Sequence, residues 1–396
     1  MSIQVFLLCI LMWMCLFLYA AFFTDMKNPA LLRPARSATN GSKYVNDTWK
    51  RISVTKGTKT ILLWKELFWG YRFGLGRTAF VKVGCRVSNC LITHNASLMP
   101  HEDFDAILIH PPTQRTPHIF KNRRPDQMFV MFTTEPPAHM PENMDVFDNY
   151  FNWTMTYRTG STFHLKYGEI APLESVPSTM EEAVAMRQVM RRSGINPAQS
   201  KTKLAIWLVS NCNARSNRQE YVNLLKKFVP IDIFSKNGQC GGRDECPREK
   251  NADVCYDLIE QTYKFYLAFE NSICVEYVTE KFFEMMGRNI VPVVFGGADY
   301  AAIAPPHSYI NARDYTPRQL AEYLNELDRN DTLYAEYFWW KPHYRVSNLY
   351  ETNRQAFCDL CEALHSTSLE KSTVKGMQTW YINQAHCANR PIIKEN

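Results

Sequence analysis

The 396-residue chain has no long run of basic residues, no internal repeat and no low-complexity tract. Lys and Arg outnumber Asp and Glu by only six (45 against 39), and no run of Lys and Arg exceeds three residues, so a nucleic-acid partner is not expected. Disordered and fibrous classes are excluded as well, because 46% of the residues are hydrophobic. The length suits roughly two or three globular domains, and the slight positive excess suits a single anionic ligand.

Charged residues are also missing from the stretch 5–23. At ~1.5 Å per residue, a helix of this length reaches roughly 28 Å, about the thickness of a bilayer core. A cleaved signal peptide is the alternative, but no basic residue precedes the stretch and no good cleavage site follows it. We expect an uncleaved signal-anchor over 5–23 after a cytoplasmic tail of residues 1–4.

Beyond the anchor, the sequence carries five N-x-S/T sequons and ten of its twelve cysteines. This combination is typical of a glycosylated chain in an oxidising compartment. We therefore expect a single-pass type II membrane protein with a luminal body, joined to the anchor by a Pro- and Ser-containing stem over 24–58. The candidate glycosylation sites are Asn40, Asn46, Asn95, Asn152 and Asn330.

The luminal body alternates short apolar runs with helical patterns, which predicts an α/β fold with parallel sheets. A helix over 179–192, bounded by Pro177 and Pro197, separates two such halves. We expect two Rossmann-like domains, 59–195 and 200–345, that face a cleft. The predicted strands are 60–64, 104–109, 128–132, 204–210, 231–234, 265–269 and 290–295, and the other predicted helices are 217–228, 280–286 and 317–327.

A candidate ligand site follows the apolar strand 265–269, where Glu270 and Asn271 end the strand. Thr279 suits an N-cap, which places Glu280 and Lys281 in the first turn of the next helix. A helix start with a lysine beside it can bind a diphosphate. The alternative is that Glu280 only complements the helix dipole and Lys281 is solvated.

The same region resembles the donor-binding motif of the α1,3/4-fucosyltransferases. The matching segments are 263–272 (YKFYLAFENS), 277–281 (YVTEK), 291–297 (VPVVFGG), 306–310 (PHSYI), 210–221 (SNCNARSNRQEY) and 151–158 (FNWTMTYR). One departure is Glu276, where many relatives have Asp.

The resemblance implies a GT-B fold, GDP-fucose as the donor substrate and inversion at the transferred sugar carbon. It implies that Arg218 and Lys281 grip the diphosphate, that Glu280 faces ribose or fucose hydroxyls, and that Asn271 and Tyr277 line the donor pocket. It also implies a Golgi membrane enzyme with a glycoprotein glycan as acceptor.

An inverting transfer needs a base for the acceptor hydroxyl, a contribution of roughly 10²–10⁴ in rate. Glu135 lies in the segment 133–137 (TTEPP), which ends a strand of the first domain. It matches the strand-end Glu that serves as the base in the resembling family. The alternative is a loop carboxylate made rigid by two prolines.

Asp103 and Asp105 form a DxD pair, a pattern that can bind a metal and a diphosphate when it follows a strand. Here the pair precedes an apolar run, so we expect it to mark the entry of a strand. His110 ends that strand, a position from which it could touch an acceptor, but we expect an ordinary surface or core histidine. Because Lys and Arg neutralise the leaving group, a divalent ion (Mn or Mg) is compatible with the chemistry but not required by it.

The cysteines favour disulfides over zinc, because a lumen does not keep thiolates reduced. The resemblance implies that Cys358 and Cys361 bridge to Cys85 and Cys90, so that the segment 346–396 packs back on the first domain. For the remaining cysteines, either Cys387 pairs with one of five others or two stay free. Those five are Cys212, Cys240, Cys246, Cys255 and Cys274.

The resulting hypothesis is an α1,3-fucosyltransferase that acts on O3 of an N-acetylglucosamine-containing glycan. One alternative keeps the scaffold with another linkage or acceptor, and another is an inactive luminal glycan-binding protein. The acceptor stays open between the N-glycan chitobiose core, LacNAc and LacdiNAc.

Overall fold

The structure, a computed structural model, describes residues 56–65, 73–117, 120, 122–246, 248–366 and 372–393. The expected tail, anchor and nearly all of the stem lie outside the described residues, as do the sequons at Asn40 and Asn46. Within the described part, no helix combines the length and apolar composition needed to cross a bilayer. The chain from Lys56 onward forms one compact unit, which is described by itself.

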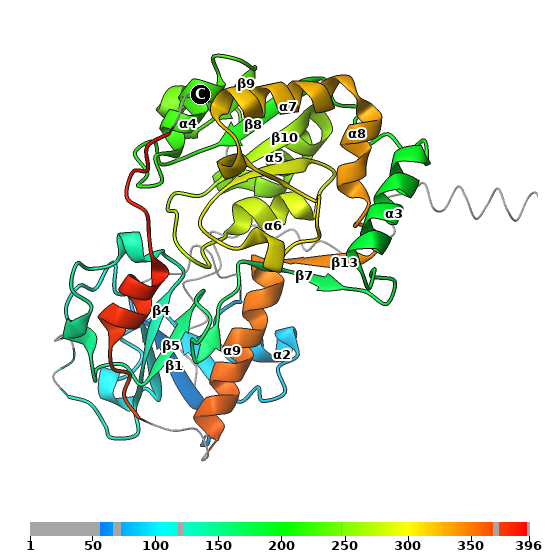
Figure 1. Cartoon of the computed structure of the whole chain (residues 1–396). Helices are drawn as coiled ribbons and strands as arrows, with labels where there is room; N and C mark the ends of the chain where they lie inside the picture. The colour runs from blue at the N-terminus through cyan, green and yellow to red at the C-terminus, as the bar shows by residue number, and fades with distance from the viewer. Residues whose placement is uncertain are drawn as a thin grey trace, which may run out of the picture. The chain divides into compact units, whose positions relative to one another are not determined.

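The first half of this unit is a parallel six-stranded sheet, ordered β2-β1-β3-β4-β5-β6. Its strands β1, β4 and β5 are labelled in the lower part of Figure 1. Its central strands β3 and β4 are almost continuous apolar runs, as is typical of a parallel sheet that is covered on both faces. The strands are β1 (Lys59–Leu63), β2 (Cys90–Thr93), β3 (Ala106–Ile109), β4 (Met128–Thr133), β5 (Trp153–Thr156) and β6 (Phe163–His164).

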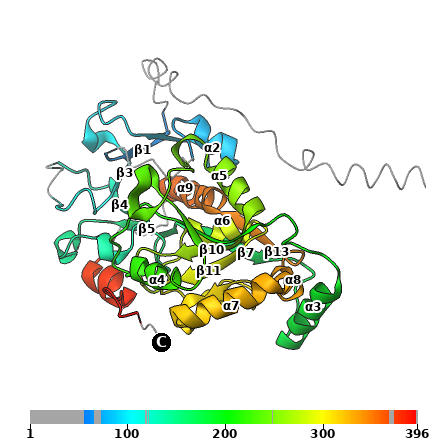
Figure 2. The same ribbon diagram turned by 90° about the horizontal axis from the view of Figure 1, so that it is seen from above.

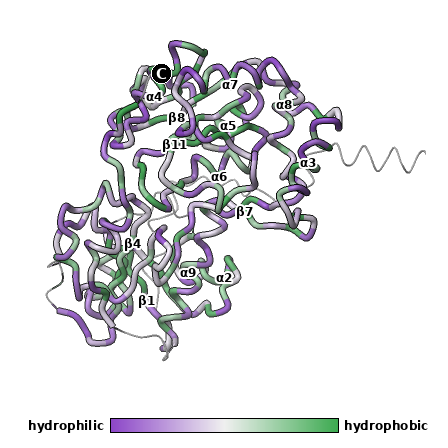
Figure 3. The backbone as a smooth tube through the Cα atoms, in the orientation of Figure 1, coloured by the Kyte–Doolittle hydropathy of each residue, from purple (hydrophilic) through white to green (hydrophobic). Residues whose placement is uncertain are grey.

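The second half is a parallel five-stranded sheet, ordered β12-β11-β10-β8-β9. Its strands are β8 (Lys203–Leu208), β9 (Ile231–Phe234), β10 (Tyr263–Phe269), β11 (Val291–Phe295) and β12 (Ile310–Asn311). In both sheets the hydrophobic segments concentrate along the strands (Figure 3). The α/β class with two parallel sheets, expected from the alternating pattern, is therefore confirmed.

Helices cover both faces of the second sheet (Figure 2). One face packs against α4 (Arg218–Leu225) and α7 (Pro317–Arg329), and the other against α5 (Arg248–Thr262) and α6 (Glu280–Met286). The long helix α7 starts at a capping box made by Thr316 and Gln319 and buries a stripe of leucines.

The chain crosses between the two sheets three times, the last time with its C-terminal residues. On the first passage it forms β7 (Gly168–Pro172), which pairs antiparallel with β13 (Tyr344–Asn348) of the return passage. After β7 comes α3 (Met180–Arg192), which agrees with the helix predicted over 179–192 and has Thr179 as its N-cap. After β13 comes α9 (Leu349–His365), whose Phe357 and Leu360 lie in the core of the first sheet. The shorter helices are α2 (Thr78–Val83) and α8 (Asp331–Ala335).

Disulfide bonds fasten α9 to the first sheet, with Cys85 joined to Cys358 and Cys90 to Cys361. In the second half Cys212 pairs with Cys240 and Cys246 with Cys255, and Cys274 pairs with Cys387. Cys387 thus takes one of the five middle cysteines. The close grouping of Cys90, Cys361 and His365 is not a metal site, because both of its sulfur atoms are in one disulfide.

Candidate active site

Glu135 lies just beyond the carboxyl end of β4, at the edge of the first sheet that the second sheet approaches. Its Oε2 atom is 2.7 Å from Nδ1 of His139, which a short 3₁₀ turn at Pro137–His139 brings back over the carboxylate. The Glu135 amide donates to Thr133 Oγ1 at 3.0 Å. The side chain is 41% exposed, so the carboxylate is held in place and still reaches solvent.

Positive groups lower the pKa of Glu135 below its usual 4.5. The largest cause is the hydrogen bond from His139, which outweighs partial burial; the charges of His139, His110 and Lys281 act in the same direction. His110 follows β3, the neighbouring strand, and burial lowers its own pKa to about 4. A carboxylate from the first sheet and a lysine from the second sheet therefore act on each other.

Lys281 lies in the first turn of α6, and its side chain is largely buried. Its Nζ is 2.7 Å from Thr279 Oγ1, 3.2 Å from Glu280 Oε1 and 3.4 Å from Glu270 Oε2. Thr279 occupies the predicted N-cap position of α6, but its hydroxyl contacts both carboxylate oxygens of Glu270 and does not cap the helix.

Glu270 is fully buried, although it follows the strand end where a ligand-facing side chain was expected. Its Oε1 accepts the Thr279 amide at 2.8 Å, and burial raises its pKa. The buried Glu270 carboxylate thus orients Thr279 and Lys281 through these contacts. Sequence spacing cannot distinguish this role from a direct role, because it does not give the direction of a side chain at the end of a strand.

Arg218 is 3% exposed, and burial lowers its pKa. Its guanidinium donates to the carbonyls of Phe269 at 2.6 Å and of Asn211 at 3.1 Å. It therefore joins the ends of β8 and β10. Its Nε has no partner among the described residues, and an arginine has five N–H groups, so donors are left for a ligand.

Other buried polar atoms near these strand ends also have no partner within the described part of the chain. They are Asn271 Oδ1, Ser272 Oγ and Ser216 Oγ. Buried polar groups are nearly always hydrogen-bonded, so such a group of orphaned atoms favours a polar ligand. Tyr277, in contrast, is 3% exposed and packs edge-on against Tyr157, with ring centroids 5.2 Å apart. Burial raises its pKa well above the usual value.

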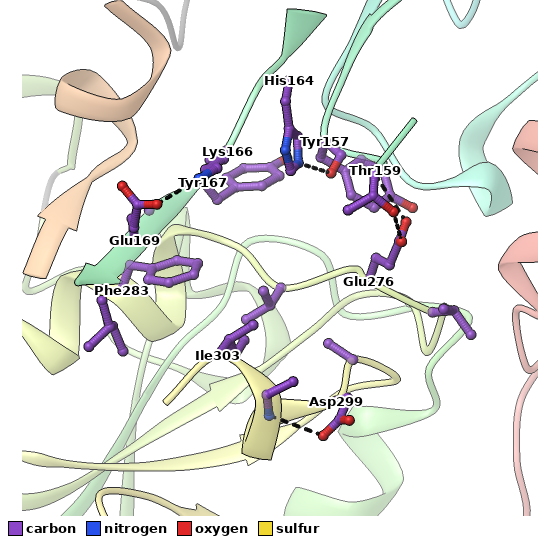
Figure 4. Close-up of a pocket in the computed structure, with 16 residues that line it drawn as sticks. Tyr157, Thr159, His164, Lys166, Tyr167, Glu169, Glu276, Phe283, Asp299 and Ile303 are labelled. Carbon is purple, nitrogen blue, oxygen red and sulfur yellow. Dashed lines mark hydrogen bonds and ion pairs between the residues drawn. The ribbon is translucent and has the colours of Figure 1, made fainter. Parts of the chain in front are cut away.

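A cavity of about 410 Å³ lies beside this region, between residues of both halves (Figure 4). Tyr167, Phe283 and Ile303 give it an apolar wall, and Glu276 lies on its rim. Neither Glu135 nor Lys281 lines it, so the cavity adjoins the candidate site and is not part of it. Gly168 is required on this wall, because a Cβ there would come within 2.2 Å of Phe283.

Glu276 connects the two halves at the rim of this cavity (Figure 4). Its Oε2 is 2.9 Å from Nε of the buried Arg158, and the Thr159 amide and hydroxyl also donate to it. Its backbone has φ +65, which a side-chain-bearing residue seldom adopts. The segment that leads to Tyr277 and Lys281 is therefore tied to the end of β5.

The structure also describes the surroundings of the DxD aspartate Asp105 and of three of the predicted glycosylation sites. Asp105 binds Lys59 Nζ at 2.9 Å and the Thr60 amide at 2.8 Å, so it has the strand-entry role and not a metal-binding one. Asn95 and Asn330 are partly exposed and stay compatible with glycans. Asn152 is only 9% exposed and its Oδ1 accepts the amide of Phe129, so this predicted glycosylation site is less accessible than the other two.

Sequence reasoning missed His139, the Arg158–Glu276 ion pair and the contacts of the C-terminal segment. A signal existed only for His139, which stands four residues after Glu135. Of the predicted site residues, the structure brings Glu135 and Lys281 within electrostatic reach of each other, while Arg218, Glu270 and Tyr277 are buried around them.

Comparison with known proteins gives consistent matches. Residues 56–168 match the family model "Fucosyltransferase, N-terminal", and residues 198–380 match "Glycosyltransferase family 10 (fucosyltransferase) C-term". The chain is 34% identical over 363 residues to α-(1,3)-fucosyltransferase C of Drosophila melanogaster. The aligned region covers 85% of this chain and 80% of that protein. The chain is 36% identical over 334 residues to glycoprotein 3-α-L-fucosyltransferase A of the same organism, covering 83% of this chain and 60% of that protein. A crystal structure of an α1,3-fucosyltransferase with GDP-fucose is similar at a TM-score of 0.47 and 16% identity, over 81% of this chain and 94% of that one.

Proposed function

Because the chain belongs to glycosyltransferase family 10, the α1,3/4-fucosyltransferases, we propose that it transfers L-fucose from GDP-β-L-fucose to O3 of an N-acetylglucosamine-containing glycan. The acceptor glycan is carried by a glycoprotein. Fucosyltransferases named for α1,3 linkage and for glycoprotein acceptors are among its relatives, which supports both choices.

The observation that carries the proposal is the placement of Glu135 just beyond the carboxyl end of β4 and of Lys281 in the first turn of α6, where the lysine charge helps to lower the pKa of Glu135. A base and a cation that come from different sheets suit a reaction between two substrates bound on opposite sides of a cleft. We assign this arrangement to the GT-B fold, with domains 59–195 and 200–345. The segment 346–396 was expected to pack on the first domain; it does so through α9, but its last part bonds to the second half.

In the proposed reaction Glu135 accepts the proton of the acceptor O3 hydroxyl. That oxygen bonds to C1 of fucose from the face opposite the nucleotide, and the bond from C1 to the β-phosphate oxygen breaks. Its electron pair leaves with GDP, so the sugar carbon is inverted. The hydrogen bond from His139 keeps Glu135 ionised and aimed, which is the form that a base needs.

Lys281 and the remaining N–H groups of Arg218 would neutralise the charge that develops on GDP. The orphaned atoms of Asn271, Ser272 and Ser216 would then gain partners from the donor, while Tyr277 and Glu280 would border its sugar. Mn²⁺ or Mg²⁺ is compatible with this scheme, but none of its steps uses a metal.

The proposed location is the Golgi membrane, with a type II anchor over 5–23, a stem over 24–58 and a luminal body. Five disulfide bonds among the described residues suit an oxidising compartment. They would be unusual in a cytosolic enzyme.

The test is GDP release from GDP-fucose with a panel of chitobiose-core, LacNAc and LacdiNAc glycans, followed by mass spectrometry of the glycans. We expect one panel member to gain one deoxyhexose at O3, with GDP released in equal amount. Linkage to another oxygen would support a different transferase on the same scaffold. Glycan binding without any GDP release would support the inactive luminal protein and overturn the proposal.

A further inference from the structure

The C-terminal residues 373–391, named the strap below, cross from the first sheet to the second. In Figure 1 the red ribbon leaves the lower sheet and reaches the neighbourhood of α4. At its start, Val374 exchanges backbone hydrogen bonds with Phe151 and Asn149, and Asp148 accepts the amides of Gly376 and Met377 at 3.0 Å. The strap is therefore fixed on the first sheet before it crosses.

The strap contacts the loop that carries Glu135 through Tyr381, which is fully buried. The Tyr381 hydroxyl donates to the Glu135 carbonyl at 2.7 Å. Tyr167 does the same for the adjacent Thr134 carbonyl, also at 2.7 Å. Since β4 ends at Thr133, these two carbonyls lie beyond the strand ladder, and the two tyrosine hydroxyls supply their hydrogen bonds instead.

A few residues later, the strap contacts the segment that leads to Lys281. The Val275 amide donates to the Ala385 carbonyl at 2.7 Å, and the Ala388 amide donates to the Ile273 carbonyl at 2.8 Å. Between these bonds lies the disulfide of Cys274 and Cys387.

The end of the strap reaches the turn before α4. The Arg390 amide donates to the Arg215 carbonyl at 2.7 Å, and Asn217 donates to the Pro391 carbonyl at 3.1 Å. Arg218 follows directly in α4. One short stretch thus contacts in turn the loop that carries Glu135, the segment 273–275 that leads to Lys281, and the turn before Arg218.

We propose that the strap positions Glu135 relative to the donor-binding groups, with Tyr381 and the Cys274–Cys387 disulfide as its two fastening points. This inference rests on the proposed function, because it assigns the two ends of the strap to the acceptor base and to the donor site. The match to the C-terminal family model ends at residue 380, so Tyr381 and Cys387 lie beyond it. Tyr381 is a positioning residue, since it acts through the backbone of Glu135.

The first test is Tyr381→Phe, which removes one hydrogen bond and keeps the ring. Its matched control is Tyr334→Phe: Tyr334 is also fully buried, and its hydroxyl donates to the Lys264 carbonyl at 2.7 Å, away from the site. We expect Tyr381→Phe to lower kcat roughly tenfold with the GDP-fucose KM unchanged within about twofold, because small displacements of a reacting group are costly. The control should keep the wild-type kcat while its melting temperature changes to a similar extent.

The second test is the double variant Cys274→Ser with Cys387→Ser, compared with Cys246→Ser with Cys255→Ser. The first pair should raise the GDP-fucose KM several-fold, because the donor segment loses its fastening point. The second pair removes a disulfide that does not involve the strap and should leave KM unchanged.

Hydrogen exchange separates this inference from the proposed function, because it needs no turnover. In the folded full-length chain, Tyr381→Phe should speed amide exchange in peptides covering 133–139, and the Cys274/Cys387 variant should speed it in 273–279. If both peptides exchange as in the wild type, or if Tyr381→Phe and Tyr334→Phe have equal kcat, the strap does not position the site. Faster exchange in a chain that transfers no fucose would leave the strap in place and overturn only the proposed function.

Discussion

His139 returns to Glu135 after one short turn, and its Nδ1 atom lies 2.7 Å from the Glu135 Oε2 atom. This contact is the largest cause of the lowered pKa of Glu135. A carboxylate that accepts a proton from a weakly acidic sugar hydroxyl must start ionised, and the histidine holds it in that form. The pair is therefore the part of the site whose chemistry can be tested most directly.

The change Glu135→Gln keeps the shape of the side chain and removes its ability to accept a proton. Fucose transfer should fall by about 10² or more, the low end for general-base catalysis, while GDP-fucose binding is retained. Steady-state kinetics and donor titration measure the two effects, with thermal melting as the control for folding. Near wild-type transfer by the folded variant would place the base elsewhere.

The change His139→Gln should move the acid limb of the pH–rate profile to higher pH. Glu135 works in its ionised form, and its pKa lies below 4.5 because His139, His110 and Lys281 favour that form. Without the histidine the carboxyl titrates at a higher pH, so activity is lost sooner as the pH falls. The pH dependence of kcat/KM for wild type and variant checks the sign, and an unmoved limb would contradict it.

The change Lys281→Ala should weaken GDP-fucose binding and slow turnover together, by roughly tenfold or more in kcat/KM, because a charge facing the diphosphate acts in ground and transition states alike. Lys281→Arg is the matched control, since it keeps the charge and should be less impaired. The alanine variant should also be less stable by about 1–3 kcal/mol, because Glu270 loses a buried partner. Unchanged donor affinity and rate would mean that Lys281 is only structural.

Peptide mapping without reduction should recover Cys85 linked to Cys358 and Cys90 linked to Cys361. Replacing Cys358 and Cys361 together by Ser should lower the free energy of unfolding by roughly 2–5 kcal/mol, because each bridge closes a loop of over 270 residues. Chemical denaturation measures the loss. Free thiols at these four positions in the native protein would contradict the pairing.

The strands were predictable wherever the sequence has an unbroken apolar run bounded by polar residues, as in β4 and β11. The strand β2 was missed because its sequence CLIT has only Leu91 and Ile92 as strongly apolar residues, between a cysteine and a threonine. The helix α9 was not predicted, although its apolar face completes the core of the first sheet.

The candidate site also contains residues that could be predicted from the sequence and residues that could not. Glu135 and Lys281 could be selected because each stands where an element ends or begins, and the parallel topology brings such positions together. The burial of Glu270 and the inward turn of Arg218 could not be predicted, since side-chain direction beyond a strand end depends on tertiary packing. The contact of Tyr381 with Glu135 spans 246 residues and has no local signal at all.

The position of α9 also dictates an order of events during synthesis. The sheet strands from β1 to β6 leave the ribosome early, but the helix that covers their core comes only after the entire second sheet. Until then an apolar face stays uncovered, and the thiols of Cys85 and Cys90 have no native partner. The first half of the molecule therefore matures last although it is made first, and a nascent chain that stops short of Cys361 leaves the sheet exposed to chaperones and to wrong disulfides.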